Sequence, residues 1–364
     1  MLASKSMEPA PDLKTKPATS EVRIIRLLGL ISTGYVLSLL SLFASMEWIG
    51  ERNWILSLLI YVPSHLWLLP LGILVPVSFY FHSWRCLWPL GGGIVAFFLF
   101  VPCRWAGQQT PPAGSLTFLT NNIANSNHQS VQPFIREQDP DIIALQEAKG
   151  RKLNYSKAFP GRFVAGCNQF ILISKYPILS ATVVEKADWV GRPVAARFEL
   201  NVNGRQLVVY NIHMPTPRPD FAKLLGFGLL RETLGVERNR RRSDGRSYRE
   251  SMEARIELAE NLVQQISSEK LPFVLMGDFN MPDHGYIYHL FASKFTDVFA
   301  KGGRGWGWTF PGFGSHDFGM MGPWLRIDYL FAGQGWKPVS CKTEPGRRSK
   351  HRAVAACLAL TDQN

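Results

Sequence analysis

One stretch of the sequence joins an expected buried strand to residues that can bind a phosphate or a metal. The apolar run Phe273–Met276 is bounded by Pro272 and Gly277, which is typical of a buried strand. Directly after it come Asp278 and Asn280, two short polar side chains at the rim of the expected sheet. A Gly-Asp pair after a strand is also ordinary turn chemistry, so this motif alone does not decide between a site and a turn.

Other expected strands place polar side chains at their ends in the same way. These side chains are Asn122 after Leu116–Thr120, Glu147 at the end of Pro140–Glu147, Asn211 at the end of Gln206–Asn211 with His213 just after it, Asp328 within Arg326–Phe331, and Lys350 and His351 before Ala353–Leu360. A carboxylate beside an amide at one rim offers the hard oxygen ligands that Mg²⁺ prefers. Taken singly, Glu147 would be a solvated acid and His213 a surface or structural histidine. The inference therefore depends on whether these strand ends meet.

The elements that must position these residues are short strands with few helices between them. The helical pattern is clearest in Ser251–Ser267, whose apolar residues fall on one face. Asn203-Gly204 is a hairpin turn signal. Further expected strands are Phe170–Ser174, Ala181–Glu185 and Pro193–Asn201, and shorter expected helices are Val131–Arg136 and Tyr286–Ala292. A loop rich in Gly and aromatic residues, 302–322, either supplies stacking surfaces over a site or covers the sheet ends.

The N-terminal part indicates a membrane region. Residues 1–22 are rich in Pro, Ser, Thr and Lys and are expected to form a disordered leader. Leu27–Met46 has no charged residue over 20 positions, which is enough to span a bilayer. Trp54–Phe81 predicts a second, proline-kinked span, and Leu87–Val101, flanked by Trp residues, predicts a third. A cleavable signal peptide is the alternative for the first run, but the leader before it and the apolar runs after it argue against that.

The flanking charges predict the orientation of these spans. Five basic residues precede the first span, whereas the following loop holds one Arg and two Glu, so the positive-inside rule places the N-terminus in the cytoplasm. Three spans then put the chain from Arg104 outside the cytoplasm, in the periplasm or its equivalent, whereas two spans leave it inside. The expected divisions are a cytoplasmic leader 1–22, a transmembrane region 23–105, a linker 106–114 and a folded domain 115–361.

Charge is concentrated in the soluble part. Residues 104–364 contain 33 basic and 23 acidic residues and so carry +10 of the net +12. Such a balance favours a polyanionic or phosphorylated partner, or an anionic membrane surface. The basic run 238–246 and the apolar patch Leu224–Leu230 form either a solvated loop or an arm that faces substrate or lipid. The five cysteines include no CxxC pair, so the sequence indicates neither a disulfide framework nor a zinc site.

The order of these motifs resembles the endonuclease/exonuclease/phosphatase superfamily, which includes deoxyribonucleases, abasic-site endonucleases, sphingomyelinases and inositol-polyphosphate 5-phosphatases. The resemblance covers about Ser115–Leu360, and its motifs are, in order, Asn122, PDIIALQE, LISKYPI, NIHMP, GDFN, RIDYLF and SKH. It implies an α/β fold, a four-layer α/β sandwich in which two packed, mostly antiparallel sheets are flanked by helices. It also implies hydrolysis of a phosphoester bond with a divalent metal, Mg²⁺ or Mn²⁺.

The resemblance also implies a role for each matching residue. Glu147, with Asn122 close by, would hold the metal. His351, oriented by Asp328, would be the base that prepares water for in-line attack on phosphorus. The remaining expected site residues are Asp278 and Asn280 for positioning the nucleophile and phosphate oxygens, His213 for donating to a nonbridging oxygen, and Lys350, Asn211 and Arg326 for substrate binding.

One residue departs from the family pattern. The last family motif is usually Ser-Asp-His, and here it is Ser349-Lys350-His351. Lys350 removes one anionic ligand and adds a cation, which fits one-metal chemistry, a specialised enzyme or a non-catalytic phosphate-binding relative. The sequence thus predicts a membrane-anchored metal-dependent phosphodiesterase of nuclease type, with nucleic acid as a partner and the bilayer bound by the N-terminal helices. The alternatives are a phospholipid, sphingolipid or inositol-phosphate phosphohydrolase and a binding protein without turnover, and no protein partner can be inferred.

Overall fold

The chain forms two compact units in a computed structural model that describes residues 19–101, 103–107, 109–124, 129–185, 188–217, 247–312 and 322–361. The first unit consists of Met1–Ser41 and Trp67–Phe97, and the second of Leu42–Leu66 and Phe98–Asn364. The predicted basic run 238–246 and the apolar patch Leu224–Leu230 lie outside the described residues, as do residues 313–321 of the aromatic loop.

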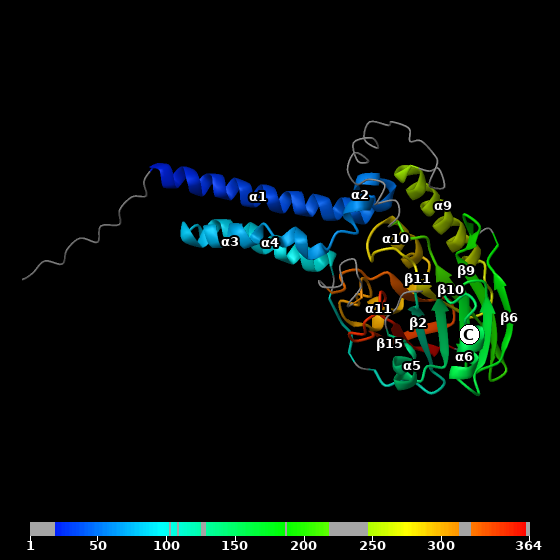
Figure 1. Cartoon of the computed structure of the whole chain (residues 1–364). Coiled ribbons are helices and arrows are strands. Elements are labelled where there is room, and N and C mark those ends of the chain that lie inside the picture. The colour runs from blue at the N-terminus through cyan, green and yellow to red at the C-terminus, as the bar shows by residue number, and fades with distance from the viewer. Residues whose placement is uncertain are drawn as a thin grey trace, which may run out of the picture. The chain divides into compact units, whose positions relative to one another are not determined.

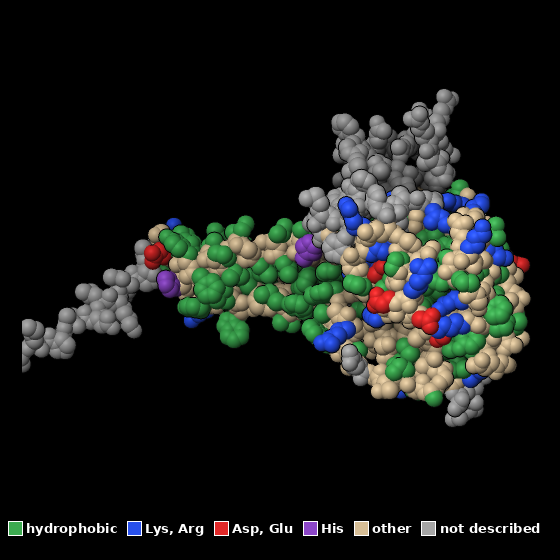
Figure 2. All heavy atoms as spheres, turned by 60° about the horizontal axis from the view of Figure 1, so that its bottom comes forward, with side chains coloured by type: hydrophobic (Ala, Val, Ile, Leu, Met, Phe, Trp, Pro, Cys, Tyr) green, Lys and Arg blue, Asp and Glu red, His purple; other side chains and the backbone are tan. Residues whose placement is uncertain are grey.

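The first unit is helical and apolar. Helix α1 (Thr19–Trp48) begins in this unit and includes a stretch, Ser20–Trp48, that is long and apolar enough to cross a membrane. The other apolar helices among the described residues are shorter, Ser64–Tyr80 and α4 (Trp84–Phe100). Hydrophobic side chains cover much of the visible helical surface (Figure 2). One long helix gives weak support to a membrane anchor, and the number of spans stays a prediction.

The stretch expected to form the second span is divided between the two units. It contains three separate elements, α2 (Trp54–Leu59), η2 (Ser64–Leu68) and α3 (Leu71–Tyr80). Asn53 starts α2 because its side chain accepts hydrogen bonds from the Ile55 and Leu56 amides. Residues 54–66, together with η1 (Gly50–Arg52), belong to the second unit.

Two six-stranded sheets form the centre of the second unit (Figure 1). One has the order β15-β16-β2-β3-β5-β4, with bounds Trp336–Thr343, Val354–Leu360, Leu116–Asn122, Ile142–Gln146, Phe170–Ser174 and Phe163–Cys167. The other has the order β12-β14-β11-β10-β9-β6, with bounds Thr296–Asp297, Asp328–Ala332, Phe273–Asp278, Arg205–His213, Ala195–Val202 and Ile178–Val183. Two short pairs lie outside them, β1 (Arg104–Trp105) with β13 (Arg304–Gly305), and β7 (Asp188–Trp189) with β8 (Arg192–Pro193).

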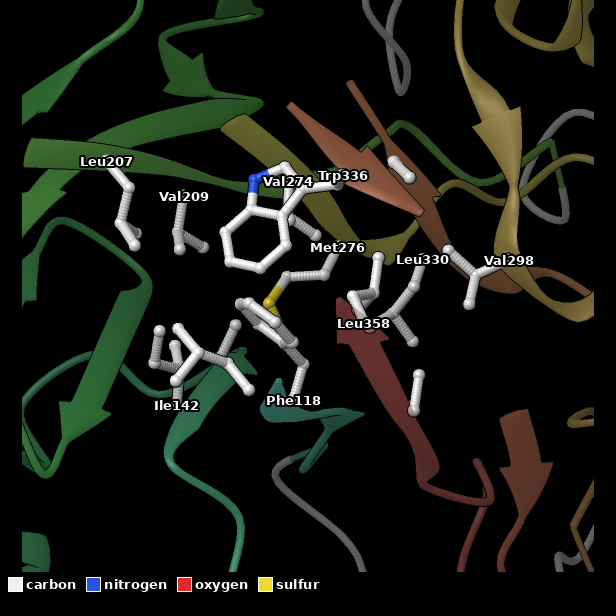
Figure 3. Close-up of a cluster of buried hydrophobic side chains, with 14 of the residues drawn as sticks. Phe118, Ile142, Leu207, Val209, Val274, Met276, Val298, Leu330, Trp336 and Leu358 are labelled. Carbon is white, nitrogen blue, oxygen red and sulfur yellow. The ribbon is translucent and has the colours of Figure 1, made fainter. Parts of the chain in front are cut away.

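The layers follow from where apolar side chains are buried. Alternate residues of both sheets, including Phe118, Val209, Met276 and Leu358, meet in one cluster between the sheets (Figure 3). Helices α9 (Tyr248–Ser267) and α10 (Tyr286–Ala292) pack on the outer face of the sheet that contains β11. Helices α5 (Gln132–Gln138) and α6 (Lys152–Ala158) pack on the outer face of the other sheet, and the short α11 (Val298–Gly302) lies against β15. The predicted four-layer α/β sandwich is confirmed.

Candidate active site

Strand direction brings most of the predicted residues to one edge of the sandwich. In one sheet β2 and β3 are parallel, so Asn122 at the end of β2 lies beside the end of β3, just before Glu147. In the other sheet β10 and β11 are parallel, and His213 is the register partner of Asp278. The antiparallel strand β14 begins at this edge, where Asp328 pairs with Asp278. His351 precedes β16, which runs antiparallel to β2 and begins at the same edge.

Gly277 allows β11 to approach β10 closely at this point. Its φ of 151° lies in a region that residues with a side chain rarely adopt, and an added Cβ would lie 1.9 Å from the Ile212 carbonyl oxygen. The glycine of the GDFN motif is therefore required to place Asp278 next to His213.

Asn122 links the two sheets through hydrogen bonds. Its Nδ2 donates to Asp278 Oδ2 over 3.0 Å and to Glu147 Oε1 over 3.3 Å. Its Oδ1 accepts from the Ala124 amide over 3.0 Å. The orientation of the side chain is thus fixed, and it holds a carboxylate from each sheet.

His351 and Asp328 form a buried pair with a defined tautomer. The His351 Nδ1 lies 3.0 Å from Asp328 Oδ2 and 3.2 Å from Oδ1, and since a carboxylate accepts, Nδ1 carries the proton. The Nε2 atom faces Asp278 Oδ2 at 3.7 Å. Burial alone would lower the pKa of His351, but the charges of Asp328 and Asp278 outweigh it and raise this pKa to about 9. Burial chiefly raises the pKa of Asp278.

His213 lies against the same carboxylate in a different environment. Its Nδ1 is 2.8 Å from Gln169 Oε1, and the Gln169 amide is oriented by donation from Nε2 to the Pro193 carbonyl over 2.9 Å. The His213 Nδ1 therefore carries a proton, and its Nε2 faces Asp278 Oδ2 at 3.7 Å and Glu147 Oε1 at 4.0 Å. Burial lowers the pKa of His213 in spite of these acids. It can donate from Nε2 only as the imidazolium.

Comparison with protein families identifies this arrangement. The model of the Endonuclease/Exonuclease/phosphatase family matches residues 116–349, which is more than half of the chain. The chain belongs to this family. Members hydrolyse phosphoester bonds and generally depend on a divalent metal, so the protein is a phosphoester hydrolase.

Solved structures of this family are similar over most of the chain. A family protein from Bacteroides thetaiotaomicron is 18% identical with a TM-score of 0.47, and the match covers 70% of this chain and 100% of that one. The mannosyl-6-phosphatase of the same organism is 17% identical with a TM-score of 0.46, over 68% and 100%. A 3′ phosphatase from Neisseria, bound to a product DNA hairpin, is 15% identical with a TM-score of 0.42, over 68% and 100%. The search of curated proteins gave no match.

The residues at this edge fit a hard divalent cation of the kind that the family uses. Glu147 is partly exposed, with 34% of its side chain accessible, and lies next to the buried Asp278 through their shared contact with Asn122. Asp278, Asp328 and His351 form a second, fully buried group, whose ligand atoms lie within 4.8 Å of one another. Carboxylate and amide oxygens suit Mg²⁺ or Mn²⁺. We favour the Glu147 side because the Asp328 carboxylate is already engaged by His351.

The predicted substrate-binding residues are not all found at this edge. The structure does not favour the predicted substrate contact of Arg326, because its buried guanidinium pairs with Asp297 Oδ2 over 2.8 Å and with Asp283 Oδ2 over 3.4 Å. Asn211 is fully buried and its amide donates to two backbone carbonyls, so it supports the strands beneath the site. Lys350 is half-buried beside His351, and its substrate contact stays a prediction.

Several supporting residues were not found from the sequence. Gln169 orients His213, and the Phe310 ring packs 5.0 Å from the His351 ring. Gln146, which precedes Glu147, donates to Asn211 Oδ1 over 2.7 Å. Arg347 donates to Asn121 Oδ1 and to the His351 carbonyl. Arg347 lies four residues before His351 and could have been suspected from that spacing, whereas Gln169 has no local signal.

Proposed function

We propose that this protein is a membrane-anchored, divalent-metal-dependent phosphodiesterase that hydrolyses nucleic acid by in-line attack of water. The observation that carries the proposal is the convergence of Asp278, Asp328 and His351 in one buried group, with Glu147 and His213 beside it. A phosphodiester is an anion, so donors and a cation must offset its charge before water can approach phosphorus.

The base in this reaction is His351. The Nδ1–H group donates a hydrogen bond to Asp328, so in the neutral imidazole the lone pair is on Nε2, where it can take a proton from water. Asp278 faces this Nε2, and its Oδ1 accepts from the Asn280 amide over 2.9 Å, so both residues border the position of the attacking water. Asp328 would also stabilise the imidazolium that forms.

The phosphate oxygens would lie toward Glu147 and His213. His213 donates to a nonbridging oxygen as the imidazolium, a form that the substrate's own negative charge favours. Glu147, with Asn122, would hold the divalent cation. When bound, such a cation offsets charge on the phosphate and lowers the pKa of the nearby His351 by repulsion.

Charge and shape beside the site support an extended anionic substrate. A cavity of about 290 Å³ begins at Ile123 and Ala124, just beyond Asn122, and is lined by Gln132, Arg151, Asn154, Tyr155 and Arg347. The amides of Gln132 and Asn154 and the guanidinium of Arg151 suit a second phosphate or a base, whereas the Arg347 guanidinium is engaged by Glu344, Gln129 and Asn121. The +10 charge of residues 104–364 has the same implication.

The second unit supports one membrane topology. Leu42–Leu66, which begins with the end of α1, and Phe98–Asn364 belong to one compact unit. The chain that follows Trp48 and the chain from Phe98 would therefore lie on the same side of a membrane that α1 crosses. Residues 67–97 between them then cross the membrane twice or not at all. If α1 crosses the membrane, the N-terminus and the second unit would lie on opposite sides, and a cytoplasmic N-terminus would put the site outside the cytoplasm.

The test is hydrolysis by the full-length chain in detergent or nanodiscs. Substrates are bis-p-nitrophenyl phosphate, plasmid DNA and vesicles that contain phosphatidylcholine or sphingomyelin, each with Mg²⁺ or Mn²⁺. We expect diester hydrolysis and plasmid nicking that EDTA abolishes and that His351→Ala lowers by about 10²-fold or more. Glu147→Gln should raise the metal concentration for half-maximal activity about tenfold, whereas Glu137→Gln, on an exposed helix position, should not.

Two outcomes would change the conclusion. Hydrolysis of the lipid vesicles without plasmid nicking would replace nucleic acid by a lipid headgroup as the substrate, consistent with the apolar N-terminal helix. No turnover of any diester by the folded, metal-loaded chain would overturn the enzymatic proposal and favour a phosphate-binding role marked by Lys350.

A further inference from the structure

A segment that precedes the family domain in sequence is built into the second unit. Residues 42–66 belong to the same compact unit as the site. The Ser57 hydroxyl and the Tyr248 hydroxyl are 2.7 Å apart, and Trp54 and Leu58 pack against Tyr248 and Met252 of α9. The segment is thus anchored on α9 by its own contacts.

The end of this segment reaches the backbone of Asn280. The Tyr61 hydroxyl donates to the Asn280 carbonyl oxygen over 2.8 Å. Arg255 of α9 donates to the same oxygen from Nη2 over 2.9 Å, and its Nη1 and Nη2 each lie 3.4 Å from the Tyr61 hydroxyl. Arg255 is fully buried, and Glu51 of the same segment is the buried acid whose charge acts on it. Two donors therefore converge on one carbonyl.

Asn280 needs such support because its backbone conformation is unusual. Its φ is 49°, in the left-handed region that residues other than glycine seldom adopt. Its amide donates to Asp278 Oδ1 and its Nδ2 donates to the Met214 carbonyl, each over 2.9 Å. Among the described residues no hydrogen bond is made to the Asn280 side-chain oxygen, Oδ1, so this oxygen remains available to a ligand. The carbonyl is the remaining polar group by which the peptide can be fixed.

We propose that Tyr61, together with Arg255, is a positioning residue that fixes the Asn280 peptide and so orients the Asn280 side chain toward the attacking water and the phosphate. Through Tyr61 alone, the segment between the first two apolar helices then contributes one supporting contact to the site. This inference rests on the proposed function, since it assigns a task to Asn280 in hydrolysis.

A second contact gives the same segment a link to His351. Tyr61 packs against the buried cluster of Trp324, Leu325 and Ile327, and so does Phe310. Phe310 in turn packs against the His351 ring, with 5.0 Å between the ring centroids. Burial raises the pKa of Tyr61 to about 12, so its hydroxyl keeps the proton that it donates at neutral pH.

The test uses Tyr61→Phe in the full-length chain, with bis-p-nitrophenyl phosphate and Mg²⁺ or Mn²⁺. Ser57→Ala is the matched control, because it removes a hydrogen bond of the same segment that does not reach Asn280. We expect Tyr61→Phe to lower kcat about tenfold with KM unchanged, because misorientation of a catalytic group acts on the chemical step. Ser57→Ala should leave kcat unchanged. In an Asn280→Ala background, Tyr61→Phe should cause no further loss.

Three results would overturn the inference. They are a kcat for Tyr61→Phe equal to that of Ser57→Ala, a change in KM alone, and effects of Tyr61→Phe and Asn280→Ala that multiply in the double variant. Each requires an active wild-type chain, so each leaves the proposed function intact. Absence of turnover by the wild-type chain would instead overturn the proposed function and the inference with it.

Discussion

The two histidines at the site have opposite properties although both face Asp278 at 3.7 Å. The difference comes from the partner of each Nδ1, which is the Asp328 carboxylate for His351 and the neutral Gln169 amide for His213. An anion raises the pKa of His351 to about 9, whereas burial lowers the pKa of His213. Local neighbours thus give two chemically identical side chains opposite pKa shifts. In the proposed reaction the bound cation would lower the pKa of the base, His351, and the charge of the substrate would favour the imidazolium of the donor, His213.

At this scale we predict that Asp328→Asn shifts the pH profile to lower pH. Neutral His351 is the base, so activity rises as pH passes through its pKa. Loss of the Asp328 charge lowers this pKa, and the rising limb should move down by about 1–3 pH units. The plateau should also fall about 10²-fold, because the imidazole loses its orientation. The measurement is kcat/KM against pH at saturating Mg²⁺ or Mn²⁺.

The control for this prediction is Glu199→Gln, which removes a carboxylate of β9 that pairs with Arg197 of the same strand. It should leave the rising limb where it is. A limb that stays in place or moves to higher pH in Asp328→Asn would mean that His351 is not the titrating base.

At the scale of elements, strand ends were predictable and their partners were not. The apolar runs of the sequence predict β5 and α10 with the bounds that the structure has. The polar residues at the ends of other predicted strands indicate the edge at which the site lies. Strand β15 was missed because Pro338 and its mixed pattern of buried and exposed residues hide the strand period. The contact of Tyr61 with Asn280 spans 219 residues, so no local pattern could indicate it.

Arg326 shows why a strand-end residue type does not by itself predict a role. It precedes β14, two residues before Asp328, yet its guanidinium lies among Asp283, Asp297 and the Tyr329 ring. Side chains two residues apart in a strand point to the same side, but Arg326 lies before β14 begins, so this periodicity does not place its side chain. A buried ion pair and a substrate contact look the same in the sequence.

We predict that Arg326→Met destabilises the fold and leaves substrate affinity unchanged. It leaves the buried Asp297 carboxylate without its cation, which typically costs about 3–5 kcal/mol of unfolding free energy. KM for bis-p-nitrophenyl phosphate, measured where the variant is folded, should stay within about twofold of wild type, since no substrate contact is lost. Chemical denaturation gives the first quantity and steady-state kinetics the second. Arg304→Met, at an exposed position, should change neither, and a large rise in KM in Arg326→Met would restore the substrate-binding role.

For the whole molecule, the limits of the family match and of the folded unit differ. The family match begins at residue 116, whereas the second unit also includes Leu42–Leu66. Arg255 is buried against Tyr61, and Tyr248 against Ser57. These contacts are long-range, so they appear only when the chain is folded.

We therefore predict that a fragment of residues 104–364 is less stable than the full-length chain. Without Tyr61 and Glu51 the Arg255 guanidinium keeps its hydrogen bond to the Asn280 carbonyl but loses a hydroxyl partner and the acid that offsets its charge, which should cost about 3 kcal/mol or more. Thermal unfolding of the fragment and of the full-length chain in the same detergent measures the difference. A synthetic peptide of residues 42–66 should raise the fragment's Tm by mass action, and a scrambled peptide should not. Equal Tm values for fragment and full chain would show that the segment is dispensable.

The same unit determines the topology that we expect in a membrane. Because Leu42–Leu66 folds with the domain, an odd number of crossings separates the N-terminus from the site if α1 spans the bilayer. Protease treatment of sealed inner-membrane vesicles that carry the chain with an N-terminal and a C-terminal tag tests this. The N-terminal tag, on the cytoplasmic face, should be cleaved from inverted vesicles while the C-terminal tag survives until detergent is added. Cleavage of both tags in intact vesicles would contradict this topology. It would mean either two crossings, which would separate Leu42–Leu66 from Asn280, or no crossing, which would leave the whole chain in the cytoplasm.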